Sequence, residues 1–199
     1  MKYKPWFLMR YLFFLVLLSL SFASGAQFTK NVYWTEQTTL VPGDVIYYSV
    51  LRPLAWKDFR GAPDVSSKAS AVTASGFGYK ADYKNTGTKY NVNISVYCYF
   101  NKNNSWVKNG CTTGYILNHE QQHFDISFIA ANIFVDKLKA AELNKTNYNA
   151  ALPALYKECC EIMNKMQEEY DSQTKNGQSK EMQAKWNIYL KEKMKLITR

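Results

Sequence analysis

The sequence predicts an α+β fold, in which a small antiparallel sheet from the N-terminal half packs against long C-terminal helices. Residues 40–100 are rich in Val, Tyr, Thr and Ser and are punctuated by turn residues, which is typical of strands. From Thr113 onward the chain shows helical periodicity almost to its end. Strands followed by helices indicate an α+β domain. We therefore expect residues 27–199 to form a single domain, with residues 40–110 mainly in strands and residues 113–196 mainly in helices.

Each expected element follows from a local pattern. Alternation of apolar and polar residues is clearest at residues 92–96, in the second of two strands that flank a turn at residues 84–87. Thr112 or Thr113 is the expected N-cap of the first helix, and Asn147 that of the second. The expected strands are residues 44–50, 69–83 and 90–100, and the expected helices are residues 114–143, 148–171 and 180–196.

The first 26 residues have the composition of a signal peptide. Positive charges near the start precede an almost unbroken run of Leu, Phe and Val at residues 11–22. Small residues at positions 24–26 then fit a cleavage site before Gln27. No later stretch reaches the roughly 18 apolar residues that a membrane span needs. We therefore expect an exported protein, periplasmic or secreted, without a transmembrane segment after removal of the signal peptide.

Composition and charge exclude several classes of protein. Hydrophobic residues make up 47% of the chain and charged residues 21%, which argues against extensive disorder. No internal repeat of solenoid length is present. The formal net charge is +9, but the C-terminal lysines alternate with glutamates on an amphipathic helix. We interpret them as a solvated helix face and expect no binding of nucleic acid.

The four cysteines are interpreted through the expected export. They are Cys98, Cys111, Cys159 and Cys160. An oxidising compartment permits two disulfides, with three possible connectivities. A bridge between the adjacent Cys159 and Cys160 would strain the backbone, and a zinc cluster is disfavoured because there is no Cys-x-x-Cys pair. We therefore expect disulfides, with the pairing left open.

The sharpest chemical pattern is His119-Glu120-Gln121-Gln122-His123. Two histidines at positions i and i+4 of a helix lie one above the other, close enough to bind one zinc ion. The glutamate after the first histidine can reach a zinc-bound water and act as general base. The alternative is a pair of core histidines hydrogen-bonded to backbone or tyrosine. His119 and His123 are the only histidines in the chain, which favours a ligand pair.

The helical wheel supports the metal interpretation. With about 100° per residue, His119, Glu120 and His123 point toward the apolar half of the expected helix. Polar residues on the opposite half, among them Gln121 and Asp125, are expected to face solvent. Three polar side chains directed into an apolar environment would be costly without partners, whereas they are accounted for around a metal ion.

A catalytic zinc ion needs a third protein ligand and an open fourth position. Nothing after His123 follows the Gly-x-x-His pattern of metzincins, so the third ligand must be Asp, Glu or, less favourably, Cys. On the second expected helix, Glu158 and Glu169 flank the apolar stripe, and Asp171 lies where that helix is expected to end. Asp125 is nearly opposite the histidines on its own helix and is not expected to bind the same ion.

Three segments of the chain resemble the bacterial family catalogued as domain of unknown function 922. Its members are described as predicted secreted zinc-dependent proteases. The middle segment is His-Glu-Gln-Gln-His-Phe-Asp at residues 119–125, with Ser-Trp-Val before it at residues 105–107. The first is Leu-Ala-Trp-Lys-Asp-Phe-Arg-Gly at residues 54–61. The last combines Tyr-Asp-Ser-Gln-Thr-Lys-Asn-Gly at residues 170–177 with Gln-Ala-Lys-Trp at residues 183–186.

The resemblance implies His119 and His123 as zinc ligands and Glu120 as the base. The family often carries His-Gly where this chain has Asn176 followed by glycine, and asparagine is a poor zinc ligand. Asp171, in the Tyr-Asp pair that matches the family, is then the implied third ligand.

We therefore expect an exported zinc-dependent hydrolase of zincin-like fold, acting as a peptidase on a peptide or protein substrate. In it Glu120 takes a proton from the attacking water, and a strand lining the cleft pairs with the extended peptide. The tyrosine that stabilises the oxyanion is left open among Tyr115, Tyr156 and Tyr170. The alternative is a non-catalytic envelope binding or scaffold protein on a degenerate zincin-like fold. The effect of Glu120→Gln separates the two functions.

Overall fold

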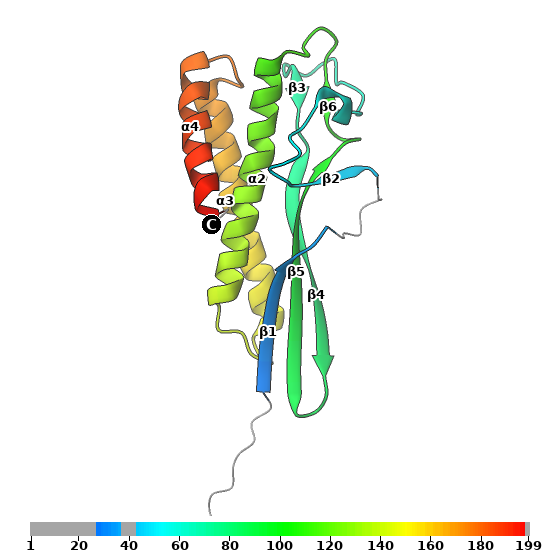
Figure 1. The fold of residues 1–199 in the computed structure, drawn as a ribbon, viewed down its shortest axis with the longest axis vertical. Helices are drawn as coiled ribbons and strands as arrows, with labels where there is room; N and C mark the ends of the chain where they lie inside the picture. Colours follow the sequence, from blue (N-terminus) through cyan, green and yellow to red (C-terminus); the bar gives the residue numbers. More distant parts are fainter. Residues whose placement is uncertain (1–26, 37–42, 198–199) are drawn as a thin grey trace, which may run out of the picture.

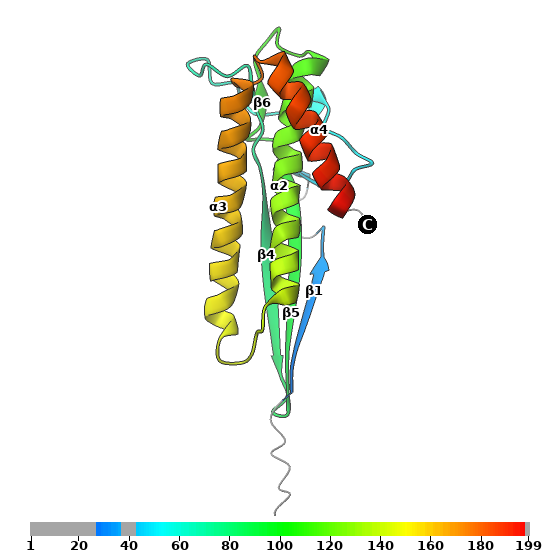
Figure 2. The same cartoon turned by 90° about the vertical axis from the view of Figure 1, so that its left-hand side faces the viewer.

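The structure is a computed structural model that describes residues 27–36 and 43–197. A layer of helices covers one face of a sheet, as Figure 1 shows in profile and Figure 2 shows with the helices in front of the strands. The β-strands come first along the described chain and the α-helices follow. The predicted α+β class is confirmed.

The main sheet is built on its longest strand, β5 (Lys89–Asn101). β4 (Ser75–Asn85) pairs with β5 antiparallel along one edge. The other edge of β5 pairs with β1 (Gln27–Trp34), which runs parallel, and with β2 (Val45–Tyr47), which runs antiparallel. The sheet is therefore mixed: the predicted small antiparallel sheet is found in the pairing of β2 and β4 with β5, but the prediction is wrong for the parallel β1.

The expected strand at residues 69–83 is divided in two by a buried serine. Its first part is β3 (Ala71–Val72), which leaves the main sheet and pairs with β6 (Trp106–Val107). The Oγ atom of Ser105 donates to the carbonyl oxygen of Asn101 and accepts from the backbone N–H of Ala74. Ser105 is fully buried, so its hydroxyl holds the chain where β3 turns into β4.

The helices agree with their predicted ranges within three residues. They are α2 (Gly114–Ala140), α3 (Tyr148–Thr174) and α4 (Lys180–Ile197). Thr113 is the N-cap of α2, and its hydroxyl accepts from the backbone N–H of Ile116 at 3.2 Å. α2 and α3 run antiparallel, so the first half of α2 lies beside the last half of α3 (Figures 1 and 2).

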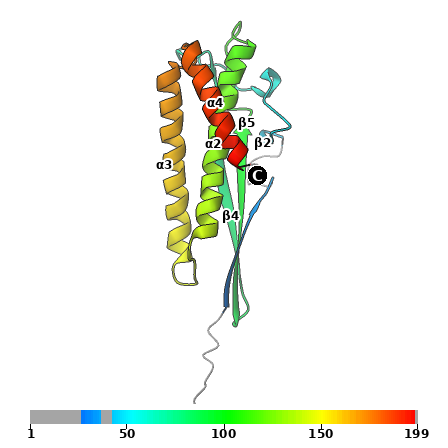
Figure 3. The same ribbon diagram turned by 60° about the vertical axis from the view of Figure 1, so that its left-hand side comes forward.

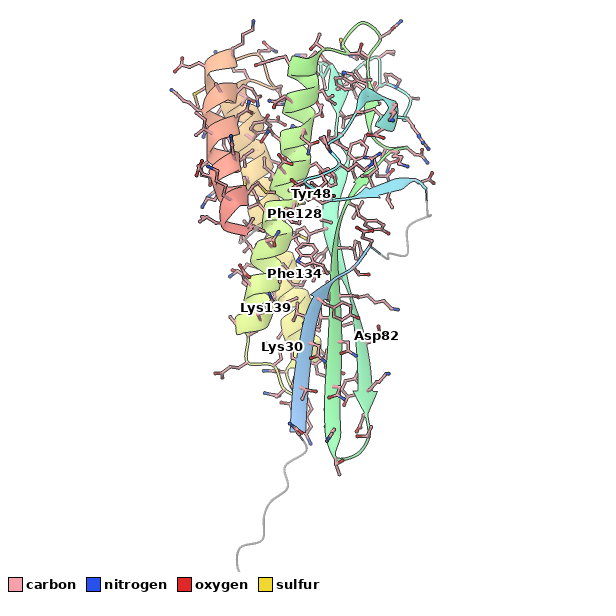
Figure 4. All side chains as sticks on the ribbon, viewed as in Figure 1. Lys30, Tyr48, Asp82, Phe128, Phe134 and Lys139 are labelled. Atoms are coloured by element: carbon pink, nitrogen blue, oxygen red, sulfur yellow. The ribbon has the colours of Figure 1, made fainter. Side chains whose placement is uncertain are left out.

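The main core lies between the sheet and the helix pair. Val92, Ile94 and Val96 of β5 are fully buried, as their alternation predicts, and pack in one cluster with residues of α2 and α3. Near the middle of α2, the ring of Tyr48 stacks on Phe128 with ring centroids 4.0 Å apart (Figure 4). Full burial of an apolar side chain, as at Val92 and Ile94, stabilises the fold by about 1.5–3 kcal/mol.

A second cluster attaches α4 to the other two helices. Trp186 and Leu190 of α4 pack with Tyr170 of α3 and with residues of α2. Figure 3 shows α4 crossing the upper part of α2. On α2, Asp125 accepts from the hydroxyl of Tyr48, so it does not simply face solvent as predicted. The helical wheel identifies the polar half of α2, but it contains no information about the segments that cover that half.

Three further expectations concern export and redox state. The four cysteines are free thiols, so the expected disulfides are not formed in the structure. Burial raises the pKa of the Cys98 thiol well above its usual value. The predicted signal peptide, residues 1–26, lies outside the described residues. Among the described helices, none combines the length and apolarity that crossing a membrane requires.

Candidate metal centre

Two imidazoles and one carboxylate converge where the first half of α2 meets the end of α3. His119 and His123 lie one turn apart on α2, and Asp171 lies in the last turn of α3. The Oδ1 atom of Asp171 is 3.3 Å from Nε2 of His119 and 3.1 Å from Nε2 of His123. The two Nε2 atoms are 3.3 Å apart. These three atoms could hold one metal ion.

The triangle formed by these atoms has the size that a tetrahedral zinc site requires. Ligands bound to zinc at about 2.1 Å lie roughly 3.4 Å from one another at the tetrahedral angle. The separations found, 3.1–3.3 Å, are close to that value. Two imidazoles and one carboxylate also leave a fourth position open, as in catalytic zinc sites.

Two carboxylate oxygens here are buried without hydrogen-bond partners. Among the described residues, neither Oδ1 of Asp171 nor Oε2 of Glu120 has such a partner. Glu120 is only 4% exposed. A buried polar group without a partner is costly. A cation bound between Asp171 and the imidazoles would offset this cost at Asp171, so the residues present fit a metal ion.

The ligand side chains also influence one another's ionisation. Burial alone would raise the pKa of Asp171, but hydrogen bonds and charge from His119 and His123 in their protonated form outweigh burial and hold the pKa well below its usual range. Burial alone would lower the pKa of His123, but the contact with Asp171 and the charge of Glu120 outweigh it and raise that pKa. Asp171 is therefore an anion at neutral pH, which is the form that binds a metal.

The three ligand side chains lie in a cleft with a volume of about 670 Å³. Its walls come from the segment around β3, the start of α2, the second half of α3 and the loop between α3 and α4. Besides the ligands and Glu120, the cleft is lined by Ala69, Ser70, Ala71, Val72, Thr73, Ser75, Tyr115, Ile116, Met163, Asn164, Gln167, Asn176, Gly177 and Gln178. Apart from His119, Glu120, His123 and Asp171, none of these lining residues is Asp, Glu, His, Lys, Arg or Cys.

The wall formed by β3 presents peptide groups that have no backbone partner among the described residues. The N–H of Lys108 donates to the carbonyl oxygen of Ser70, so residues 70 and 72 bond toward β6. Because peptide groups alternate in direction along an antiparallel strand, those of Ala71 and Thr73 point away from β6. The Thr73 hydroxyl donates to the carbonyl oxygen of Glu120, which ties this wall to α2.

The loop after α3 forms another wall and contacts a ligand directly. Gly177 has a φ of +79°, and a Cβ atom there would lie 3.2 Å from Cγ of His119. The hydroxyl of Tyr115 donates to the carbonyl oxygen of Gly177 at 2.6 Å. Asn176, where the resembling family often has histidine, lines the cleft but is not among the three converging residues.

The structure distinguishes among the acids considered as the third metal ligand, because they lie at different distances from the histidines. Glu158 pairs with Lys137 at 3.0 Å, and Glu169 with Lys165 at 3.9 Å. Neither lines the cleft. Asp171 alone of these acids is brought to the histidines, in agreement with the residue implied by the family resemblance.

The three tyrosines considered as oxyanion donors have different environments. Tyr170 is fully buried, and its hydroxyl is bound to Gln183 and to the backbone of His119. The Tyr156 hydroxyl donates to the carbonyl oxygen of Phe77, and Tyr156 does not line the cleft. Tyr115 lines the cleft and is 37% exposed. Tyr115 is therefore the tyrosine with access to a ligand in the cleft.

Sequence analysis missed two amides that contact the histidines. Gln167 of α3 lies with Oε1 2.5 Å from Nδ1 of His123. Gln183 of α4 lies with Oε1 2.9 Å from Nδ1 of His119. Glutamines are common on solvated helix faces, so nothing in the pattern distinguishes these two.

Comparison with protein-family models, with curated proteins and with solved structures found no match to this chain.

Proposed function

We propose that this chain is an exported zinc-dependent hydrolase of zincin-like fold, and within that class a peptidase. The observation that carries the proposal is the convergence of Nε2 of His119, Nε2 of His123 and Oδ1 of Asp171 within 3.3 Å of one another. The next residue along α2 after the first ligand is Glu120, a buried acid with a free oxygen.

The donor set and its neighbour support zinc. Two imidazoles and one carboxylate also serve non-haem iron(II) oxygenases. Glu120 favours hydrolysis, because an iron oxygenase has no need of a general base next to its ligands. When bound, zinc supplies Lewis acidity, which activates water as a nucleophile and polarises a carbonyl group.

Residues of the cleft are suited to the other tasks of peptide hydrolysis. Glu120 accepts the proton of the attacking water and returns it to the leaving amine. Tyr115 can donate its hydroxyl toward the oxygen on which negative charge develops once that hydroxyl leaves the carbonyl oxygen of Gly177. The free peptide groups of Ala71 and Thr73 bind an extended substrate backbone as an added strand.

The neutral lining supports a peptide over an anionic substrate. No lysine or arginine is among the described residues that line the cleft, so a phosphate or sulfate ester would have no cation besides the metal. Asn164, Asn176 and Gln178 offer amide groups that can bond to a substrate backbone of either polarity.

Metal content of the protein purified without chelator tests the proposal. We expect about one zinc ion per chain, and loss of that zinc in His123→Ala and in Asp171→Ala. Glu120→Gln should keep the zinc and reduce hydrolysis of a casein or peptide substrate by about 10²–10⁴-fold, because only the base is removed. Absence of zinc after reconstitution of the wild-type protein would sink the proposal and favour the envelope scaffold. Unchanged hydrolysis in Glu120→Gln would refute the role of the base.

A further inference from the structure

We propose that Gln167 and Gln183 are positioning residues that hold both histidines in the tautomer with a proton on Nδ1 and a bare Nε2. The expected effect of these glutamines on zinc affinity rests on the proposed function, whereas the assignment of the tautomers does not. The two glutamines come from different helices, α3 and α4, and each contacts one ring.

The contacts of Gln167 fix which end of its amide faces His123. Its Nε2 donates to the carbonyl oxygen of His123 at 2.8 Å, and it also lies 3.5 Å from Oγ of Ser127. A carbonyl oxygen can only accept, so the amide nitrogen must be on that side. The amide oxygen then faces Nδ1 of His123, and that nitrogen must carry the proton.

The contacts of Gln183 give the same result for His119. The Tyr170 hydroxyl donates its one proton to the carbonyl oxygen of His119, so at 2.6 Å it accepts from Nε2 of Gln183, which also donates to Oδ1 of Asn187 at 2.9 Å. The Gln183 oxygen therefore faces Nδ1 of His119, which must donate. Gln183 is 1% exposed, so water does not compete for this contact.

Both Nε2 atoms consequently present lone pairs to Asp171. A neutral imidazole carries one proton, and the hydrogen bond at one nitrogen decides which of the two nitrogens is free. Three lone-pair atoms then face one another at 3.1–3.3 Å, an arrangement that repels in the absence of a cation and attracts a cation between them. The two amides therefore preorganise the Nε2 atoms for metal binding in the metal-free protein.

The second consequence concerns the charge around the metal. A carboxylate in place of the glutamine amide, hydrogen-bonded to Nδ1, would make the imidazole a stronger electron donor. An amide oxygen accepts the same hydrogen bond without a formal charge. Among the described residues, Asp171 is then the only anion that contacts the imidazole Nε2 atoms, and a metal bound there would keep more of its Lewis acidity.

α4 thereby acquires a function that its sequence does not reveal. It packs on Ile126 and Ile129 of α2 and reaches His119 through Gln183. Its contribution to the site is Gln183, together with Asn187 one turn later. The helix holds a ligand in place without touching the metal position.

Ring-nitrogen chemical shifts of the metal-free protein test the tautomers. We expect protonated Nδ1 and bare Nε2 for both histidines at alkaline pH, where the rings are neutral. In Gln167→Leu the His123 ring should shift toward the Nε2–H tautomer while His119 is unchanged, and in Gln183→Leu the reverse should occur. Gln173→Leu is the matched control, since this α3 amide accepts from Trp186 Nε1 and contacts neither histidine. Nε2–H tautomers in the wild-type protein would overturn the inference, whether or not zinc binds.

Zinc affinity provides the second measurement. Each leucine variant should raise the zinc dissociation constant by about 10–100-fold. Removal of a residue that is hydrogen-bonded to a zinc-binding histidine typically has an effect of this size. Gln183→Glu should bind at least as tightly as the wild type, because its carboxylate still accepts from His119. Loss of affinity in Gln183→Glu equal to that in Gln183→Leu would refute positioning and indicate a packing role. If the wild-type protein shows the expected tautomers but binds no zinc, the proposed zinc hydrolase is refuted and the tautomer inference stands.

Discussion

Tyr170 packs against the rings of both His119 and His123 and restricts their rotation. Its ring stacks on His119 with centroids 4.7 Å apart and meets His123 edge-on at 5.0 Å. Because Tyr170 is fully buried and its hydroxyl is hydrogen-bonded, both imidazoles rest on a ring that is held by packing. Glu120 is rotated from His119 by about 100° on the helix, which leaves its carboxylate free beside the ligands.

Gly177 is the loop residue that lies against the ring of His119. Its φ of +79° is disfavoured for residues with a side chain, and a Cβ atom would press against the ring of His119 at 3.2 Å. We therefore expect Gly177→Ala to weaken zinc binding and to lower the free energy of unfolding by about 1–3 kcal/mol. Zinc titration calorimetry and denaturant unfolding measure the two effects.

Gly87 provides the matched control for this substitution. It has a φ of +82°, but a Cβ atom there would meet nothing within 4 Å. Gly87→Ala should therefore lower stability through the backbone alone and leave zinc affinity unchanged. Equal zinc affinity in Gly177→Ala and the wild type would contradict the importance of the contact with His119.

Residues of the site differ in how far the sequence could predict them. His119, Glu120 and His123 could be identified because ligand spacing within one helix is a local property. Asp171 needed the family resemblance, since its approach to the histidines depends on how α2 and α3 pack. Gln167 and Gln183 were missed because an amide that orients an imidazole has the same sequence signature as a surface amide.

At the scale of elements, β1 was missed because its partner is distant in sequence. A parallel strand needs a long crossover, so no adjacent turn announces it. β1 also carries a lysine whose ammonium group binds backbone carbonyl oxygens of α2, a contact that the sequence pattern does not predict. Nζ of Lys30 lies 2.5 Å, 2.9 Å and 2.6 Å from the carbonyl oxygens of Leu138, Lys139 and Ala141 at the end of α2. Figure 4 shows Lys30 on β1 beside the end of α2 that carries Lys139.

Lys30 should stabilise the C-terminus of α2. The last carbonyl groups of a helix lack intrahelical donors and carry partial negative charge. We expect Lys30→Met to lower the free energy of unfolding by about 1–2 kcal/mol, because three carbonyl groups lose a charged donor. Denaturant unfolding measures this, and hydrogen exchange should show faster opening of the last turn of α2.

Lys80 is the matched control on the neighbouring part of the sheet. Its Nζ lies 3.7 Å from Asp82, and both side chains are largely exposed. An exposed pair of this kind contributes little, so Lys80→Met should change stability much less than Lys30→Met. The opposite order would show that Lys30 does not act as a helix cap.

The first segment of the family resemblance is structural in this fold. Asp58 is buried, pairs with Arg52 at 3.0 Å and accepts from the backbone N–H of Ala55. A Cβ atom at Gly61 would lie 2.6 Å from the carbonyl oxygen of Asn103. Residues 54–61 are thus explained by packing and turn geometry, and only the second and third segments bring residues to the metal centre.

For the whole molecule, the order of strands and helices was enough to predict the α+β class, but not the place of the site. That place depends on the antiparallel packing of α2 and α3, which brings the first half of one helix to the last half of the other (Figure 2). A metal ion held by His119, His123 and Asp171 would therefore join these two helices, and through Gln183 it would also involve α4.

The last prediction follows from this joining of helices. A ligand that binds only the folded state raises the free energy of unfolding by about 2.7 kcal/mol at 100 times its dissociation constant. For a chain of this size, that corresponds to a rise in Tm of about 5–10 °C. We expect zinc to give this rise and EDTA to reverse it, with slower hydrogen exchange in the second half of α3 and in α4. The tip of the β4–β5 hairpin should not respond, because it is distant from the site along both strands.

Asp171→Asn should remove the zinc-dependent rise while leaving the metal-free protein folded. A rise of equal size in Asp171→Asn would show that zinc binds elsewhere on the chain.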